Sequence, residues 1–315
     1  MSGGFERVLI VINPVSTNFH KSHRWVVEFR KLLPHAQIET IETVPGGVEA
    51  NAKLFHARVY ELGPNTLIGV AAGDGTINQV AEILKDTKLA EAARQTVLVP
   101  LWGGNANDLA WILNGQLRKN SLKTILEQGK VMQVRPVLFS FEGALNAKRL
   151  AVMAASFGAT ALVARQLNQA SHRRKKSQKK YAVLQKLHEG LMAWKTVMNA
   201  PVHMTYEAGK MLKIYERTFV NGPRMAKYYH IPVRLTDDCF YVDTIVDKRP
   251  VITPTALTFS LLRRARKDAL QQAVSFEVHE AVWAQFDGET IQVPAKTNVT
   301  ATMLAEPLYV LSTKL

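Results

Sequence analysis

The chain has 315 residues, of which 47% are hydrophobic and 21% charged, the composition of a globular protein long enough for two domains. Its formal net charge of +14 favours a negatively charged partner, such as nucleic acid, an anionic membrane surface or a phosphorylated ligand. The single cysteine, Cys239, excludes a disulfide framework and a cysteine-based metal site, and it agrees with a cytoplasmic setting. The longest uncharged stretch, residues 150–164, is too short and too polar to cross a bilayer, so we expect no transmembrane segment.

The first 115 residues alternate short apolar runs with segments of helical spacing. Four such alternations predict an open parallel sheet with helices on both faces, a doubly wound α/β domain. The loop after each strand is polar or contains glycine, and the carboxyl ends of parallel strands share the edge where ligands bind. We therefore expect Asn13, Thr43, Asp74 and Asp108 to meet at that edge. The predicted strands are residues 8–12, 37–41, 66–72 and 96–99.

The segment Gly73-Asp74-Gly75-Thr76 stands where the third strand passes into a helix. Glycine allows positive φ and lets a ligand approach the backbone. The N–H groups that open a helix form a natural phosphate site. A carboxylate beside phosphate makes chemical sense when Mg²⁺ lies between them. This context favours a nucleotide site over a simple surface turn.

A second junction of this kind follows the fourth strand, in residues 103–108, with the sequence Gly-Gly-Asn-Ala-Asn-Asp. An ordinary helix cap needs one Asn or Asp, whereas here three polar residues follow two glycines. Two acidic loops on the same sheet edge suit a polyphosphate bridged by a metal ion. We therefore favour a functional role for this loop over a purely structural one.

After about residue 130 short β-rich runs predominate, which predicts an antiparallel β-sandwich domain interrupted by a helical stretch. We expect a nucleotide-binding domain over residues 1–130, a β-rich second domain over 131–305, and a terminal segment, 306–315, that returns to the first domain. The sequence Asp287-Gly288-Glu289 reads as a hairpin turn. A carboxylate there could act as a general base if the second domain folds over the ligand-binding edge.

The stretch from Arg173 to Lys180 holds six cations in eight residues, followed by a segment with helical apolar spacing. We expect that apolar face to be packed core. The basic run is either a solvated surface or a site for an anionic membrane. Nucleic acid is less favoured, because aromatic and basic residues do not interleave. The expected core face consists of Tyr181, Leu184, Leu187, Leu191, Trp194 and Met198.

Taken in order, these motifs resemble the diacylglycerol kinase and sphingosine kinase family of soluble lipid kinases. The resemblance covers nearly the whole chain, although the first two motifs also occur in the more distant NAD kinases. The matching segments are Asn13-Pro14-Val15-Ser16, Ala72 to Asn78, Gly104 to Ala110, Asp237-Asp238 and Asp287-Gly288-Glu289.

The resemblance implies transfer of the γ-phosphoryl group of ATP to a lipid hydroxyl, with diacylglycerol or a related lipid as the acceptor. It makes residues 131–305 the lipid-substrate domain. It makes Glu289 the proton acceptor, a role that sphingosine kinases give to the position of Asp74. Asp74 and Asp108 would serve the catalytic Mg²⁺, and Asp238 a structural metal site. The residues implied to bind the nucleotide are Asn13, Thr43, Ala72, Gly73, Asp74, Gly75, Thr76, Asn78, Gly104, Asn105 and Asn107.

Several positions depart from the family pattern: Ala72 replaces a glycine, Gln79 a glutamate, Asn105 a threonine, and Cys239 the glycine of Asp-Asp-Gly. Two alternatives therefore stay open. One is an NAD-kinase-like enzyme acting on a soluble hydroxyl acceptor, and the other is a non-catalytic nucleotide-binding relative that associates with membrane or nucleic acid. The leading expectation is a cytoplasmic, peripherally membrane-associated lipid kinase whose substrate lies at an anionic membrane surface. A homodimer is left open.

Overall fold

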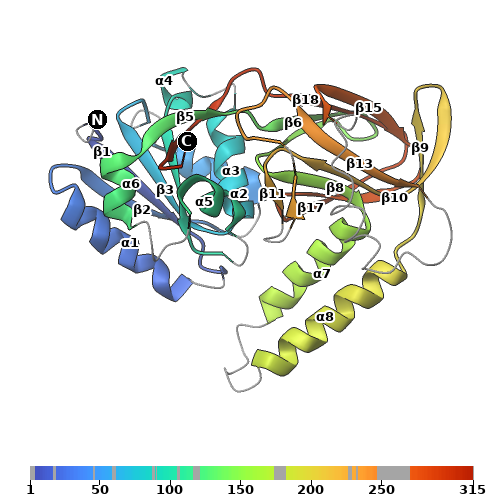
Figure 1. The fold of residues 1–315 in the computed structure, drawn as a ribbon, viewed down its shortest axis with the longest axis horizontal. Coiled ribbons are helices and arrows are strands. Elements are labelled where there is room, and N and C mark those ends of the chain that lie inside the picture. Colours follow the sequence, from blue (N-terminus) through green and yellow to red (C-terminus); the bar gives the residue numbers. More distant parts are fainter. Residues whose placement is uncertain are drawn as a thin grey trace. The chain divides into compact units, whose positions relative to one another are not determined.

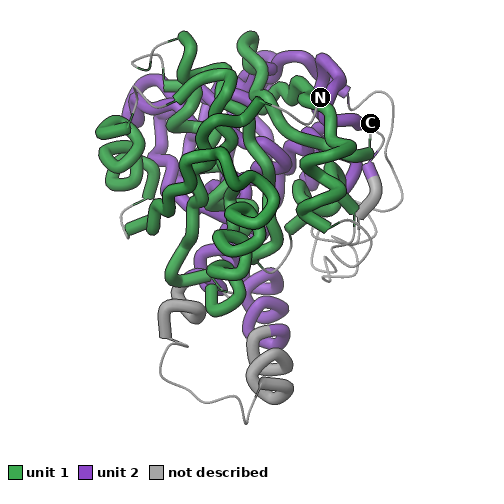
Figure 2. Tube along the Cα trace, turned by 90° about the vertical axis from the view of Figure 1, so that its left-hand side faces the viewer, with its two compact units in different colours: residues 1–136, 304–315 green, residues 137–303 purple. Residues whose placement is uncertain are grey.

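The computed structural model describes residues 4–16, 19–44, 47–58, 62–86, 89, 91–104, 107–115, 121–173, 182–225, 229–231, 233–246 and 270–314 (Figure 1). The chain divides into two compact units (Figure 2). The first unit contains residues 1–136 and 304–315, and the second contains residues 137–303. The second unit is therefore inserted between two parts of the first.

The first unit is built on a six-stranded sheet with the order β2-β1-β3-β4-β19-β5. All neighbours pair in parallel except β5, which runs antiparallel to β19. The three strands β1, β3 and β4 are almost wholly buried and apolar, as expected for a parallel sheet covered on both faces. The strands are β1 (Arg7–Ile12), β2 (Gln37–Glu42), β3 (Thr66–Ala72), β4 (Val97–Trp102), β5 (Lys130–Val134) and β19 (Leu308–Ser312).

Helices lie on both sides of this sheet, with α1 and α6 on one side and α2, α3 and α5 on the other (Figure 1). In α1 the residues at helical spacing, Ser22, Trp25 and Phe29, are buried. Trp25 and Phe29 pack with the inward-facing residues of β1 and with α6. The helices are α1 (Phe19–Leu32), α2 (Gly47–His56), α3 (Asp74–Leu84), α4 (Glu91–Arg94), α5 (Asp108–Asn114) and α6 (Leu122–Gln128).

The second unit is built on an eleven-stranded sheet in which every pairing is antiparallel. Its main order is β17-β16-β8-β10-β9-β15-β18-β6-β7, and β13 pairs with both β10 and β14. The strands are β6 (Val137–Gly143), β7 (Ala147–Ala151), β8 (Ala154–Gly158), β9 (His203–Glu207), β10 (Lys210–Val220), β13 (Phe240–Val246), β14 (Leu270–Gln271), β15 (Ala273–Val278), β16 (Val282–Phe286), β17 (Glu289–Val293) and β18 (Thr297–Met303). A separate ribbon joins β11 (Arg224–Met225) to β12 (Tyr229–His230).

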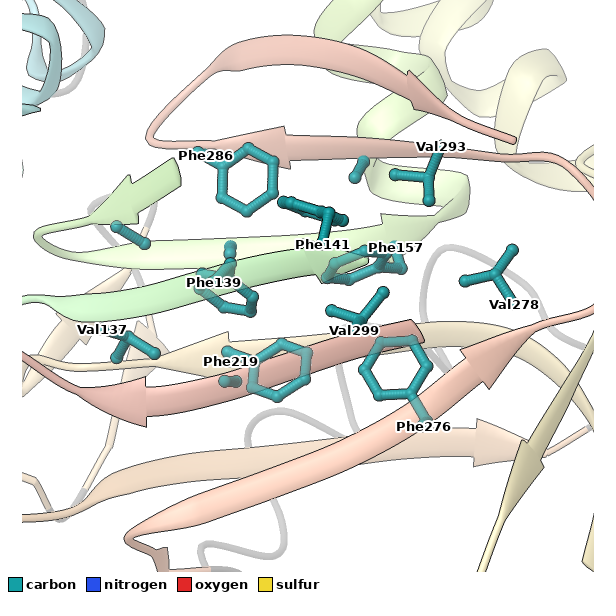
Figure 3. Close-up of a cluster of buried hydrophobic side chains, with 14 of the residues drawn as sticks. Val137, Phe139, Phe141, Phe157, Phe219, Phe276, Val278, Phe286, Val293 and Val299 are labelled. Atoms are coloured by element: carbon teal, nitrogen blue, oxygen red, sulfur yellow. The ribbon is translucent and has the colours of Figure 1, made fainter. Parts of the chain in front are cut away.

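The eleven-stranded sheet curls around a core of phenylalanines (Figure 3). Phe139 on β6 and Phe286 on β16 come from strands near opposite ends of the sheet order, yet their ring centroids are 5.1 Å apart. Phe139 also meets Phe219 edge to face at 5.0 Å, a favoured aromatic geometry. The core of the predicted sandwich is thus enclosed by one continuous sheet, and the predicted fold class, α/β followed by antiparallel β, is confirmed.

Two helices, α7 (Ala159–Arg173) and α8 (Ala182–Met198), extend from the second unit's sheet (Figure 1). Helix α7 packs against β8, β16 and β17, and α8 packs against α7. The carboxyl end of α8 is anchored by Val197, which is buried beside Ala159 and Tyr215. The Tyr215 hydroxyl donates a hydrogen bond to the Val197 carbonyl.

The expectation that the apolar face of α8 forms packed core is wrong for its described side chains. Leu191, Trp194 and Met198 are 59%, 51% and 40% exposed. The reason is that Val197 and Thr196, on the other side of the helix, are the residues that face α7. Tyr181 and the side chains of Leu184 and Leu187 lie outside the described residues. None of the helices in the described part of the chain has both the length and the hydropathy that a membrane crossing needs.

Candidate functional site

The loop after β1 is tied to the start of α3 through Asn13. The Asn13 side chain donates from Nδ2 to Thr76 Oγ1 at 2.9 Å, and its Oδ1 accepts the N–H of Val15 at 2.9 Å. Two distant parts of the sequence thereby meet at the carboxyl edge of the sheet. In the same loop, the hydroxyl oxygen of Ser16 is buried and has no hydrogen-bond partner among the described residues. A buried hydroxyl of this kind favours a site that a polar ligand completes.

The turn between β3 and α3 leaves the helix start without a side-chain cap. Gly73 is the N-cap residue, with extended φ and ψ of −84° and 173°. Asp74 and Gly75 are the first two residues of the helix, and Thr76 and Asn78 are buried in it. Because no side chain satisfies the first N–H groups, they can donate to a phosphate. Ala72 ends the preceding strand, a conformation in which a Cβ is tolerated where the family has glycine.

The loop between β4 and α5 is shaped by Asn107, a residue in the left-handed region with φ 53° and ψ 40°. Its Oδ1 accepts the N–H groups of Gly103 and Gly104 at 3.1 and 2.8 Å, and its Nδ2 donates to the Gly104 carbonyl at 2.7 Å. Asparagine is the non-glycine residue that best tolerates this conformation. The Asn107 side chain is therefore engaged in folding its own loop. Asn105 lies outside the described residues.

The two glycine loops approach each other closely. A Cβ on Gly104 would lie 2.3 Å from the Cα of Gly73, and one on Gly103 would lie 2.4 Å from the Ala71 carbonyl oxygen. No real Cβ is found at such distances from backbone, so glycine is required at both positions. The loop after β4 thus lies directly against the turn that opens α3.

The carboxylate of Asp74 accepts from the backbone of α5, with Oδ2 3.0 Å from the Asp108 nitrogen and Oδ1 3.4 Å from the Leu109 nitrogen. The pKa of Asp74 is raised to about 6, mainly by burial and also by the Asp108 carboxylate, while the N–H groups of Asp108, Leu109 and Asn107 act in the opposite direction. Within the described residues no three acidic, histidine or cysteine side chains gather into a metal site. Asp74 and Asp108 could hold Mg²⁺ only with further oxygen ligands from phosphate or water.

The loop after β2 contains Thr43, which is buried and donates its N–H to the Ile12 carbonyl at 2.9 Å. Asn51 on α2 organises this loop, and it is a residue that the sequence analysis missed. Its Oδ1 accepts the N–H of Val44 at 2.8 Å, and its Nδ2 lies 3.2 Å from Oε1 of Gln79. The available signal was one asparagine on a helix face that is otherwise apolar. Gln79, which replaces the family's glutamate, thus supplies the same kind of acceptor oxygen.

In the second unit, Asp287 holds the turn between β16 and β17. Its carboxylate accepts three backbone N–H groups, from Val152 at 2.7 Å, Met153 at 3.1 Å and Ala154 at 2.8 Å. Asp287 has a positive φ of 49°. The structural role of this aspartate was not foreseen.

The neighbouring Glu289 begins β17, is partly exposed, and pairs across the turn with Phe286. The Gly288 carbonyl accepts Nδ2 of Asn168 at 2.8 Å, which joins α7 to the same turn. Asp287 therefore fixes a turn whose position is also held by α7, and Glu289 is the carboxylate that this turn presents.

Asp238 is exposed in a turn closed by its neighbour Asp237, whose Oδ2 accepts the Arg234 N–H at 2.9 Å. Burial raises the pKa of the adjacent Cys239 thiol, and the Asp237 and Asp238 carboxylates raise it further. A structural metal bound by Asp238 stays a prediction.

Comparisons with known proteins show which proteins this chain is similar to. Residues 7–138 match the family model of the diacylglycerol kinase catalytic domain. A comparison with curated proteins gives no match.

Solved structures resemble the chain over its whole length. A diacylglycerol kinase from Bacillus anthracis str. Sterne is 12% identical with a TM-score of 0.62, and the match covers 99% of this chain and 98% of that one. A candidate diacylglycerol kinase from the same strain is 14% identical with a TM-score of 0.64 and the same coverage. Yeast NADH kinase complexed with NADH is 10% identical with a TM-score of 0.53, covering 98% of this chain and 84% of that one. At these identities the structures show a shared fold.

Over residues 7–138 the chain therefore matches a kinase catalytic domain, that of the diacylglycerol kinases. This match confirms, over that stretch, the resemblance drawn from the motifs. A match to a kinase catalytic domain implies a nucleotide co-substrate. The uncapped start of α3, the contact between Gly73 and Gly104, and the buried Ser16 hydroxyl fit a polyphosphate ligand.

Proposed function

We propose that the protein is an ATP-dependent lipid kinase that transfers the γ-phosphoryl group to a lipid hydroxyl, with diacylglycerol or a related lipid as the acceptor. The observation that carries the proposal is the match of residues 7–138 to the diacylglycerol kinase catalytic domain. The fold shared with a diacylglycerol kinase over nearly the whole of both chains supports it.

In this proposal the first unit binds the nucleotide. The N–H groups at the start of α3 and the loop containing Gly104 receive the phosphates, because they are uncapped and closely apposed. Asp74 and Asp108 would hold Mg²⁺, which supplies positive charge beside the phosphates when bound. Asn13 and Thr76 brace the turn through their hydrogen bond. Asn107 acts by shaping the loop.

The second unit receives the lipid in this proposal. Glu289 takes the proton of the acceptor hydroxyl as the oxygen forms a bond to the γ-phosphorus and the bond between that phosphorus and the β,γ-bridging oxygen breaks, releasing ADP. Asp287 does not share that task, since its oxygens accept backbone N–H groups. If Asp74 is the proton acceptor instead, as in sphingosine kinases, activity depends on Asp74 and survives the loss of Glu289.

The proposal is tested by incubating the purified protein with γ-labelled ATP, Mg²⁺ and mixed micelles of diacylglycerol or total lipid extract. A new labelled phospholipid is expected, and Asp74→Ala and Glu289→Gln are expected to abolish it. Glu142→Gln, at an exposed carboxylate of the same unit as Glu289, is the matched control and should keep full activity. Full activity in Glu289→Gln would show that Glu289 is not the proton acceptor.

The fold shared with yeast NADH kinase favours a second candidate, phosphorylation of a soluble hydroxyl acceptor such as NAD. This reaction would need neither detergent nor lipid. Label transfer to NAD in buffer alone, with none to any lipid of the extract, would decide for it. Nucleotide binding without any transfer would identify a non-catalytic relative.

A further inference from the structure

Helix α8 presents a stripe of large apolar side chains to solvent. The stripe consists of Leu191, Trp194 and Met198, which are 59%, 51% and 40% exposed. Their spacing of three and four residues places them on one face of the helix. The face directed at α7 is occupied by Val197, 6% exposed, and by Thr196, whose hydroxyl donates to Gln166 on α7. Over its described side chains, residues 190–198, the helix is therefore anchored on one side and exposes large apolar side chains on the other.

Single exposed apolar residues are common on protein surfaces, but a continuous set of large ones marks a contact site. Tryptophan in particular favours an environment that is apolar on one side and wet on the other. A helix face that contacts only water is ordinarily polar. The exposed apolar stripe of α8 therefore indicates that this face contacts an apolar partner.

Charge identifies the kind of partner. Lys195 is exposed and lies one residue from Trp194, at the border of the stripe. Helix α7 ends at Arg173 and α8 begins at Ala182, and the sequence from Arg173 to Lys180 contains six cations and no acidic residue. An exposed apolar helix face with a lysine at its border, on a helix that follows a run of six cations in the sequence, suits the surface of an anionic bilayer.

We propose that α8 docks on an anionic lipid bilayer, with Leu191, Trp194 and Met198 inserted at the boundary between headgroups and acyl chains. Docking of this kind reaches a depth of about 5–10 Å. The inference rests on the proposed function, because it supplies the surface on which a lipid kinase would meet its substrate. It assigns the membrane contact to a particular helix, which the activity alone does not do.

The test is co-sedimentation of the purified protein with vesicles of equal parts phosphatidylcholine and phosphatidylglycerol, or of phosphatidylcholine alone. Binding is expected only to the anionic vesicles and should weaken as NaCl is raised. The double variant Leu191→Ser with Trp194→Ser should bind about tenfold or more weakly. Val27→Ser, at a valine of α1 that is 66% exposed, is the control and should bind like the parent. Circular dichroism checks that α8 still folds in the double variant.

Equal binding of the parent and the double variant would overturn the proposal, as would equal binding to neutral and anionic vesicles. A concentration-dependent dimer that the double variant abolishes, with unchanged vesicle binding, would assign the stripe to a second copy of the chain. Vesicle binding without kinase activity would support the docking surface and contradict the proposed function. Activity on detergent-dispersed lipid without vesicle binding would support the proposed function and contradict the docking surface.

Discussion

The Oδ2 atom of Asp74, at the start of α3, lies 3.0 Å from the backbone nitrogen of Asp108, at the start of α5. One carboxylate thus serves two helices: it belongs to the first turn of α3 and accepts from the first turn of α5. Each oxygen of a carboxylate has two lone pairs, and the N–H groups of Asp108 and Leu109 occupy only part of this capacity. Asp74 can therefore hold the two loops together and still offer oxygen to a cation.

Asp74→Asn should separate stability from activity. The folded-state pKa of about 6 lies above the ordinary value of 3.8, so the stability contributed by this group is present at low pH and is lost as pH rises through 6. Asparagine keeps an acceptor for the Asp108 N–H without the cost of a buried charge. We expect the variant to melt about 2–4 °C above the parent at pH 7.5, the shift for about 1 kcal/mol.

The stability difference should shrink at pH 5, where the parent carboxyl is protonated. At pH 7.5 the variant should also lose phosphoryl transfer and the rise in melting temperature that Mg²⁺-ATP gives the parent. Thermal melts at both pH values, with and without Mg²⁺-ATP, measure all of these effects. A difference in melting temperature between parent and variant that is the same at both pH values would contradict the buried environment assigned to Asp74.

Gly104→Ala should disrupt the two glycine loops that we propose to bind the nucleotide. The new Cβ would lie 2.3 Å from the Cα of Gly73, and because backbone cannot yield as a flexible side chain does, the two loops must separate. We expect a loss of roughly 1–3 kcal/mol in the free energy of unfolding and a loss of ATP binding by calorimetry. Gly63→Ala, where nothing lies within 4 Å of the added Cβ, is the control. Normal ATP binding by Gly104→Ala would refute the close contact of the loops.

Substitutions at Asp287 and Glu289 should differ in their effects although the two residues are close in the sequence: those at Asp287 should lower stability, and that at Glu289 should lower kcat alone. Asp287→Ala leaves three backbone N–H groups without their acceptor, and we expect a loss of roughly 2–3 kcal/mol together with activity. Asp287→Asn, which keeps one oxygen and tolerates positive φ, should lose less. Glu289→Gln should change stability by less than roughly 0.5 kcal/mol while lowering kcat at least about a hundredfold. Urea unfolding and steady-state kinetics on the three variants distinguish the roles.

Glu216 on β10 should make the second unit sensitive to pH near neutrality. The side chain is 2% exposed and accepts the Thr160 N–H at 3.0 Å, at the start of α7. Burial raises the pKa of Glu216 to about 7, against hydrogen bonds from Thr160, Thr218 and Ser156 that lower it. The folded-state pKa lies above the ordinary value of 4.5, so its stabilising contribution is present below pH 4.5 and is lost as pH rises through 7.

Glu216→Gln should therefore gain about 2–4 °C in melting temperature on the parent between pH 6 and 8. Melting curves at pH 6, 7 and 8, with Glu142→Gln as the exposed control, measure the gain. If the melting temperatures of the parent and of Glu216→Gln change in parallel between pH 6 and 8, Glu216 does not titrate in that range.

The sequence predicted the first sheet well because a parallel sheet buries both faces of its strands, and runs such as that of β3 have no other stable location. The position of loops at the carboxyl edge follows from the same topology, which is why Asp74 and Asp108 could be expected near each other. Their roles, like that of Glu289, stay predictions. The conformation of Asn107 could not be read from the sequence, since it depends on which N–H groups its side chain reaches.

Helix α8 marks a different limit. A period of 3.6 residues reports that one face of a helix is apolar, but not what covers that face. In the described end of α8, Val197 and Thr196 face the rest of the second unit, and the apolar side chains of Leu191 and Trp194 are exposed. Asn51 was missed for a related reason, because a single polar residue on a buried face has no meaning until its partners are known.

The position of β19 has a consequence for how the protein is made. This strand lies between β4 and β5 in the first sheet, yet it is translated after the whole of the second unit. While residues 137–303 leave the ribosome, β4 has an open edge and β5 has no neighbour in the sheet to join. The inserted unit can thus reach its native state before the kinase domain that precedes it in the sequence. The first unit of the protein begins first during synthesis and is completed last.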